Sequence, residues 1–292
     1  MPVFLPNSLP EAFAALDRSP DSQLLAGGTD FMVEVNAGRR RPTSVLSLGR
    51  LPEIAGWRLE GGVVVLGAAL TYTEMLQPDL AALVPGLALA ARTVGSPQIR
   101  NAGTIGGNLG TASPAGDTLP MLAALDAAIV VGRSATETRT LQLSELVIGP
   151  KRTALEPGEI ILEVRVPARF GTQEFLKVGT RNAMVIAVAS VAVVVDWVGR
   201  SVRVALGSAG PVVMRASAAE ELATAGIDWD ERRFSRGSND LSGFVELVRA
   251  ASRPIDDHRS TADYRRHAVG VCAERAIRRA FDRDIGEVQW AS

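Results

Sequence analysis

Residues 100–117 read RNAGTIGGNLGTASPAGD, and this stretch gives the strongest indication of the fold and of a binding site. Four of its glycines, at positions 103, 106, 107 and 110, lack a Cβ and let the backbone approach a ligand closely. The polar side chains that can hydrogen-bond a ligand are Thr104, Asn108, Thr111, Ser113 and Asp117. No regular hydrophobic period runs through residues 95–120, which is typical of a functional or a disordered segment. Ile99, Ile105 and Leu109 favour order, so we expect an irregular but ordered segment that wraps a ligand.

A second glycine turn lies nearer the N-terminus, at Ala26-Gly27-Gly28-Thr29-Asp30. The preceding residues 23–26 predict a strand that ends at the two glycines. Without Cβ atoms at these positions, backbone N–H groups can approach an anion, and Thr29 adds a hydroxyl donor. An ordinary tight turn would leave the same pattern, so this motif alone does not establish a site.

The spacing of the glycines argues against two common kinds of nucleotide site. The chain has neither GxGxxG within a βαβ unit nor GxxxxGK[ST], so a nicotinamide-binding Rossmann domain and a nucleoside triphosphatase are poorly supported. A hydrolase is also poorly supported, because residues 207–210 lack the GxSxG spacing of a nucleophile elbow.

The composition narrows the range of partners. The 292 residues include 31 basic and 32 acidic side chains, and the formal net charge of −1 gives no field that would attract nucleic acid. One cysteine, Cys272, and two histidines, His258 and His267, are too few for an iron–sulfur cluster or a structural zinc. We therefore expect no nucleic-acid partner and no metal. Only Lys151 and Lys177 among the basic residues are lysines, which draws attention to both.

The sequence shows no targeting or membrane segment. Residues 1–6 have neither the basic flank nor the apolar stretch of a secretory signal. The longest nearly apolar run, residues 183–195, is shorter than the roughly 20 residues of a membrane helix and is rich in valine, which favours a buried strand. These features predict a cytoplasmic protein without a membrane span.

Hydrophobic patterning predicts an α+β protein with two domains. A helix over residues 8–17 and strands over 23–26 and 44–48 form a small α/β unit of residues 1–56. A hairpin that turns at Gly61-Gly62 opens a larger unit, residues 57–170. This unit is predicted to contain helices interrupted at Pro78 and Pro85, a helix over 121–125 and strands over 127–131 and 160–166.

Residues 171–292 are predicted to form the second domain. Its strands are expected over 174–178, 187–195 and 201–206, and its helices over 215–224, 242–252 and 261–282.

The two glycine loops together resemble those of the FAD-binding medium subunit of molybdenum hydroxylases, of the xanthine dehydrogenase and carbon monoxide dehydrogenase type. The resemblance covers most of the chain. The further motifs that carry it, in the right order, are Ser113-Pro114-Ala115-Gly116-Asp117, Pro157-Gly158-Glu159-Ile160-Ile161, Lys177 with Arg181, Leu206-Gly207 and Asp263-Tyr264-Arg265.

The resemblance implies a two-part FAD-binding domain of the PCMH or vanillyl-alcohol-oxidase type over residues 1–170. A C-terminal domain, like that of carbon monoxide dehydrogenase flavoproteins, would follow over 171–292. FAD would be bound non-covalently, and we assign no catalytic residue. The residues that the resemblance assigns to FAD are Ala26, Gly27, Gly28, Thr29, Asp30, Thr104, Ile105, Gly106, Gly107, Asn108, Thr111, Asp117, Ile161 and Lys177.

These residues have different implied roles. The backbone of 26–30 and of 104–108 would hold the pyrophosphate, while Thr111 and Asp117 would lie near the linker and ribose hydroxyls. Ile105 and Ile161 would lie near the flavin and adenine, although isoleucines are more often plain core. Lys177 would lie at the pyrimidine end of the flavin, although it also fits a surface lysine, and Asp117 fits a helix cap.

The resemblance also implies partners. The chain would be an electron-transfer subunit of an oxidoreductase that takes electrons from [2Fe-2S] clusters of a small subunit and passes them to NAD+, oxygen or another acceptor. A large subunit with the molybdenum cofactor would hydroxylate the substrate, in a dimer of heterotrimers.

The substrate of such a complex stays open. A xanthine dehydrogenase is favoured, with a carbon monoxide, aldehyde or N-heterocycle dehydrogenase as alternatives. Two other classes are a stand-alone flavin reductase of the same fold group and an assembly protein that has lost its cofactor.

Overall fold

The computed structural model describes residues 1–134, 136–168, 171–234 and 240–284, which confirm an α+β protein. They form two compact units. The first contains residues 1–83, 94–113 and 126–167, and the second contains 84–93, 114–125 and the described residues from 168 onward. The boundary that the sequence predicts near residue 170 falls at 169–170, outside the described residues, and it stays a prediction.

A small parallel sheet opens the first unit. Its strands lie in the order β1 (Val3–Phe4), β3 (Val45–Ser47), β2 (Gln23–Leu25), and helix α1 (Leu9–Arg18) packs against β3. Helix α1, predicted over residues 8–17, begins after Ser8, whose hydroxyl caps it by accepting a hydrogen bond from the Glu11 N–H at 3.3 Å. Helix α2 (Phe31–Asn36) follows β2 after the first glycine turn.

An antiparallel sheet forms the larger part of the same unit. Its strands lie in the order β4 (Trp57–Glu60), β5 (Val63–Gly67), β10 (Ile160–Pro167), β6 (Ala128–Gly132), β7 (Thr138–Gln142). The hairpin between β4 and β5 turns as predicted, because Gly61 and Gly62 both adopt positive φ, 55° and 79°. Its shorter elements are η1 (Pro52–Ile54), η2 (Glu74–Leu76), α3 (Pro78–Leu83), α8 (Leu143–Leu146), β8 (Val147–Gly149) and β9 (Arg152–Thr153).

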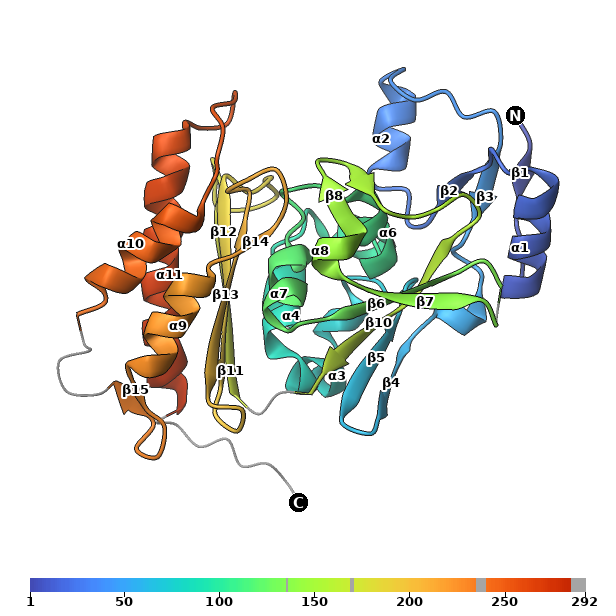
Figure 1. Ribbon diagram of the computed structural model, residues 1–292. Coiled ribbons are helices and arrows are strands. Elements are labelled where there is room, and N and C mark those ends of the chain that lie inside the picture. Colours follow the sequence, from blue (N-terminus) through green and yellow to red (C-terminus); the bar gives the residue numbers. More distant parts are fainter. Residues whose placement is uncertain (135, 169–170, 235–239, 285–292) are drawn as a thin grey trace. The chain divides into compact units, whose positions relative to one another are not determined.

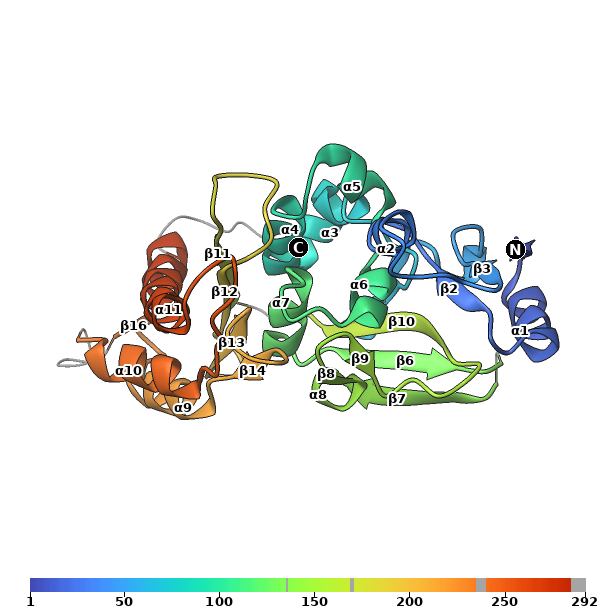
Figure 2. The same cartoon turned by 90° about the horizontal axis from the view of Figure 1, so that it is seen from above.

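The glycine-rich segment contains two helices, so the expectation of irregular chain over residues 95–120 is wrong. They are α5 (Pro97–Ala102) and α6 (Ile105–Thr111). Each is capped by a hydroxyl, because Ser96 accepts from the Ile99 N–H at 3.4 Å and Thr104 accepts from the Gly107 N–H at 3.0 Å. Ile105 and Leu109, one turn apart, are fully buried, and α6 packs beside β10 (Figure 2). Glycine weakens the helix signal of the sequence, but caps and burial form the helix nonetheless.

A four-stranded antiparallel sheet is the centre of the second unit. Its strands lie in the order β11 (Gly171–Val178), β12 (Ala189–Asp196), β13 (Ser201–Gly207), β14 (Met214–Arg215). Helices α9 (Ser217–Ala225), α10 (Ser242–Ala251) and α11 (Ala262–Asp284) cover one face, and α4 (Pro85–Arg92) and α7 (Thr118–Ala124) cover the other (Figure 1). A small ribbon of β15 (Ile227–Asp228) and β16 (Arg233–Phe234) completes it.

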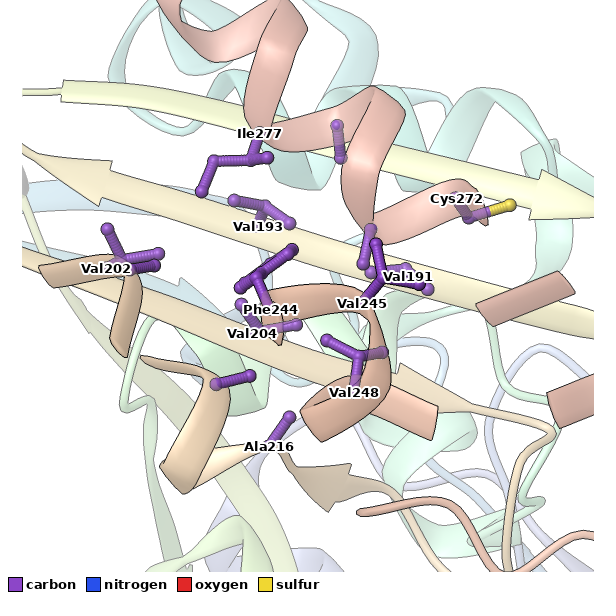
Figure 3. Packing of buried hydrophobic residues seen from close by; sticks show 14 of the residues in the cluster. Val191, Val193, Val202, Val204, Ala216, Phe244, Val245, Val248, Cys272 and Ile277 are labelled. Atoms are coloured by element: carbon purple, nitrogen blue, oxygen red, sulfur yellow. The ribbon is translucent and has the colours of Figure 1, made fainter. Parts of the chain in front are cut away.

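Helices cover both faces of this sheet, and this explains the valine run of β12. All eight residues of the strand are buried, so both alternating sets of side chains are apolar or paired. The set that faces α10 and α11 belongs to one hydrophobic cluster (Figure 3). Its labelled members are Val191, Val193, Val202, Val204, Ala216, Phe244, Val245, Val248, Cys272 and Ile277.

A buried arginine connects α11 to this sheet. Arg265, which is 2% exposed, donates to the carbonyl oxygens of Val188 at 2.7 Å and Ser208 at 3.2 Å, and to the carboxylate of Asp257 at 2.6 Å. Burial opposes the ionisation of Asp257. Hydrogen bonds from Arg259 and the charges of Arg259 and Arg265 outweigh it, and they hold the pKa of Asp257 well below its usual range.

Replacing Phe244 by alanine tests this core. Phe244 is 2% exposed, so the Phe244→Ala cavity should lower the free energy of unfolding of the second unit by about 3–5 kcal/mol. Leu222→Ala on α9, where the side chain is 46% exposed, should change it by about 0.5 kcal/mol or less. Denaturant unfolding followed by circular dichroism measures both. Equal effects of the two substitutions would contradict this assignment of the core.

Candidate cofactor site

The first unit contains a cavity of about 560 Å³ between the two glycine loops. Both loops contribute to its wall although they are far apart in the sequence. The predicted site residues that line it are Ala26, Gly27, Gly28, Thr29, Asp30, Thr104, Gly106, Gly107, Asn108, Thr111 and Ile161. The tertiary structure therefore brings most of the residues predicted for FAD into one place.

The first loop presents unused backbone donors to this cavity. Strand β2 ends at Leu25, and Gly28 turns the chain with a φ of +73° before α2 begins. The N–H groups of Gly27, Gly28, Thr29 and Asp30 have no acceptor among the described residues. Consecutive N–H groups that are free to donate form an anion-binding surface without any positive side chain.

The second loop uses its donors within the protein. The N–H groups of Ile105, Gly106 and Gly107 donate to Leu70 O at 3.0 Å, Ala68 O at 2.9 Å and Thr104 Oγ1 at 3.0 Å. The Asn108 N–H donates to Thr104 O at 3.0 Å. This loop is therefore mainly a wall of the cavity. The Thr104 N–H also has no acceptor among the described residues, but the consecutive free backbone donors are on the first loop.

Glycines allow close backbone approaches around the cavity. A Cβ on Gly27 would lie 1.7 Å from the carbonyl oxygen of Ala102, and one on Gly106 would lie 2.7 Å from the Cβ of Ala68. A side chain at either position would push the segments apart. These glycines are needed for backbone packing, and the packing shapes the cavity.

Three predicted residues lie elsewhere. Ile105 is fully buried and does not line the cavity, as its plain-core alternative had it. Asp117 and Lys177 belong to the second unit, where Lys177 Nζ donates to Asp117 Oδ2 at 2.5 Å and to Thr93 O at 3.1 Å. Their implied roles toward FAD stay predictions.

The pair of Asp117 and Lys177 is buried, with side chains 6% and 8% exposed. Asp117 is the N-cap residue of α7, as the alternative reading had it, but its side chain makes no capping hydrogen bond. Lys177 is not a surface lysine. Burial raises the pKa of Asp117, and the charge and hydrogen bond of Lys177 oppose that rise. Its second oxygen, Oδ1, has no hydrogen-bond partner among the described residues.

Sequence reasoning missed three charged residues of the cavity wall: Glu34, Arg40 and Lys151. Lys151 Nζ donates to Glu34 Oε1 at 2.5 Å, and Arg40 Nε lies 3.2 Å from Glu34 Oε2. The hydrogen bond from Lys151 lowers the pKa of Glu34. The rarity of lysine in the composition was the only signal that pointed to Lys151, and it gave no role.

The wall suits a dinucleotide cofactor. The volume of the cavity is within the range of small-molecule sites. The free N–H groups of the first loop suit a pyrophosphate. Ile161 and Leu24 give it apolar surface, and Gln23 Oε1, an enclosed atom without a donor in the described chain, can accept from a ligand N–H. Within the described ranges, no group of three or more His, Cys, Asp and Glu could hold a metal ion. Fold and cavity therefore define a class of protein with a site suited to a dinucleotide cofactor.

Known families match both parts of the chain. The FAD binding domain in molybdopterin dehydrogenase matches residues 1–169, and the CO dehydrogenase flavoprotein C-terminal domain matches residues 174–280. The chain therefore belongs to the FAD-binding subunits of the molybdenum hydroxylase family. It is the medium subunit of an oxidoreductase, as its sequence motifs predicted.

Individual relatives agree. The chain is 30% identical to the carbon monoxide dehydrogenase medium chain of Hydrogenophaga pseudoflava over 95% of this chain and 96% of that one. It is 37% identical to the nicotinate dehydrogenase FAD-subunit of Eubacterium barkeri over 67% of this chain and 69% of that one. A structure of reconstituted CO dehydrogenase from Oligotropha carboxidovorans superposes with a TM-score of 0.87 at 28% identity, covering 97% of this chain and 98% of that chain.

The cofactors divide between subunits in complexes of this type. FAD belongs to this subunit, and the molybdenum cofactor and iron–sulfur clusters belong to partner subunits. None of the helices in the described part of the chain combines the length and the apolar character needed to cross a bilayer.

Substituting Gly107 tests the cavity. A Cβ there would lie 3.0 Å from Thr104 Oγ1 and 3.5 Å from the Ala26 Cβ, so Gly107→Val places methyl groups between the loops. This variant should lose FAD binding while the second unit stays folded. Gly243→Val on α10 is the control, because its Cβ makes only an ordinary 3.4 Å contact with Leu222 and does not line the cavity. Flavin fluorescence titration and circular dichroism measure both properties. Wild-type flavin occupancy in Gly107→Val would contradict the assigned cavity.

Removing Lys177 tests the buried pair. Lys177→Met leaves Asp117 without its cation and should cost about 3–5 kcal/mol of stability at neutral pH. The folded-state pKa of Asp117 then lies further above its unfolded value of about 3.9. A carboxyl whose pKa is raised on folding loses stability as pH rises, so this variant should melt at a lower temperature at pH 8 than at pH 5. Adding Asp117→Asn should remove the pH dependence. A melting temperature of the single variant that is unchanged across this range would refute the argument.

Proposed function

We propose that this subunit carries electrons between the clusters of a small iron–sulfur subunit and an external acceptor, NAD+, oxygen or another oxidant. Bound FAD would supply the conversion between one-electron and two-electron transfer. The observation that carries this proposal is the row of free N–H groups at residues 27–30 on a cavity of cofactor size. The shortage of cluster ligands in the sequence supports the division of the redox chain among subunits.

The substrate would be oxidised in a large molybdenum-containing partner. We infer that it is an N-heterocycle. The relatives include subunits named for nicotinate, nicotine, caffeine and xanthine, which all belong to this chemical class. Relatives named for carbon monoxide and glyceraldehyde keep those two substrates as the alternative. Xanthine, favoured from the sequence, is one member of the proposed class.

The assembly would be a dimer of heterotrimers in the cytoplasm. A stand-alone flavin reductase is the second candidate, since the cavity by itself suits FAD. It would complete its catalytic cycle without any partner subunit, and this property separates the two proposals.

Co-purification tests the proposal. The tagged chain should bring down a large and a small chain with FAD, molybdenum and iron in one complex. Anaerobic addition of the N-heterocycle should then bleach the flavin and cluster absorbance together.

The Gly107→Val complex is the sharper measurement. It should keep its molybdenum and iron, and substrate should still bleach the clusters, but transfer to the acceptor should stop. The Gly243→Val complex should behave as wild type. Undiminished acceptor reduction without flavin, or a complete catalytic cycle of the isolated chain without partner subunits, would refute the subunit role.

A further inference from the structure

The charges on the cavity wall sum to zero before any cofactor binds. The charged residues among those that line the described cavity are Asp30, Glu34, Arg40 and Lys151, two acids and two bases. The pyrophosphate of FAD adds two negative charges to this wall. Neutral N–H groups can hold an anion. The carboxylate of Asp30 lies on the same loop and repels a bound phosphate. A cation that can turn toward the phosphates would therefore strengthen the binding of FAD.

Lys151 is placed to act in this way. It lies between β8 and β9 with a positive φ of 56°, and its N–H donates to the carbonyl of Ala112 at 2.9 Å. Its side chain is 59% exposed and ends at Glu34 on α2. The backbone is therefore held while the long side chain is free to move.

Glu34 does not depend on Lys151 alone. Arg40 Nε also lies 3.2 Å from a Glu34 oxygen. The guanidinium of Arg40 is in turn positioned 4.8 Å from the centre of the Phe31 ring. If Lys151 leaves, Glu34 keeps a cation.

We propose that Lys151 is a positioning residue for FAD that exchanges Glu34 for a phosphate oxygen of the cofactor when FAD binds. The inference rests on the proposed site, in which the pyrophosphate lies along residues 27–30. In the ligand-free wall Glu34 holds the lysine next to the loop, and in the complex Arg40 alone pairs with Glu34. The first loop supplies neutral hydrogen bonds, and Lys151 supplies the positive charge.

Opposite effects of two substitutions distinguish this exchange from a structural salt bridge. Lys151→Met should weaken FAD binding about 10- to 100-fold, the range expected for one hydrogen bond to a charged group. Glu34→Gln should bind FAD as tightly as wild type or several-fold more tightly, because it frees Lys151 and removes one negative charge. Lys151→Arg keeps the positive charge and should recover most of the FAD affinity that Lys151→Met loses.

The matched control is Arg58→Met. Arg58 on β4 also pairs with glutamates, Glu60 and Glu163, but does not line the cavity, so its loss should leave the FAD affinity unchanged. Met at position 151 meets the same backbone constraint as lysine, so the fold should persist, and thermal unfolding checks this.

The readout is quenching of FAD fluorescence by the apoprotein at about 0.05 M and 0.5 M salt. Wild-type affinity should fall with salt more steeply than that of Lys151→Met. If Lys151→Met and Glu34→Gln weaken FAD binding equally, the salt bridge has only a structural role in the cavity wall, and the proposal is overturned. Unchanged affinity in Lys151→Met would overturn it too. If the wild-type apoprotein binds no FAD, the proposed site itself fails, which is a distinct result.

Discussion

The approach of Gly27 to the carbonyl group of Ala102 is the contact on which the cofactor cavity depends. It leaves no room for a side chain, since a Cβ on Gly27 would lie 1.7 Å from the oxygen. This contact sets the end of β2 against the end of α5, and α6 follows directly. The first loop is thereby held open toward the cavity, and its N–H groups stay free of protein acceptors within the described chain. Most of the cofactor-binding argument follows from this one constraint.

The two glycine loops perform different tasks with similar sequences. The first leaves its N–H groups available to an anion, while the second uses its own in a helix start and in bonds to Ala68 and Leu70. In the proposed site a dianion would be held by neutral donors and one cation, so a chain of nearly zero net charge could bind a pyrophosphate. The charged residues of the wall balance each other, so a dinucleotide does not have to compete with excess negative charge there.

The second unit depends on buried polar contacts as well as on its valine core. The Asp117–Lys177 pair links the start of α7 to β11, and Arg265 links α11 to the ends of β12 and β13 through two carbonyl groups. Leaving either cation without its partners would expose a charge or a carbonyl to an apolar surrounding. These contacts therefore fix the order of helices around the sheet more specifically than valine packing can.

The sequence by itself determined the α+β class, the hairpin at Gly61-Gly62, the valine strand β12 and the membership of the family. Turn glycines and hydrophobic periodicity are local patterns of neighbouring residues. The family follows from several short motifs and their order along the chain, which the sequence shows directly. Sequence reasoning also named the two glycine loops that form part of the cavity wall, since both carry recognisable motifs. Only the tertiary structure decided which N–H groups of the loops stay free, that α5 and α6 are helices, and that Lys177 pairs with Asp117. It alone showed Lys151 beside Glu34. The free N–H groups and the two ion pairs depend on partners that are distant in the chain, and α5 and α6 depend on burial as well as on their local caps. No local pattern encodes which acceptor or counter-charge the folded backbone will bring near.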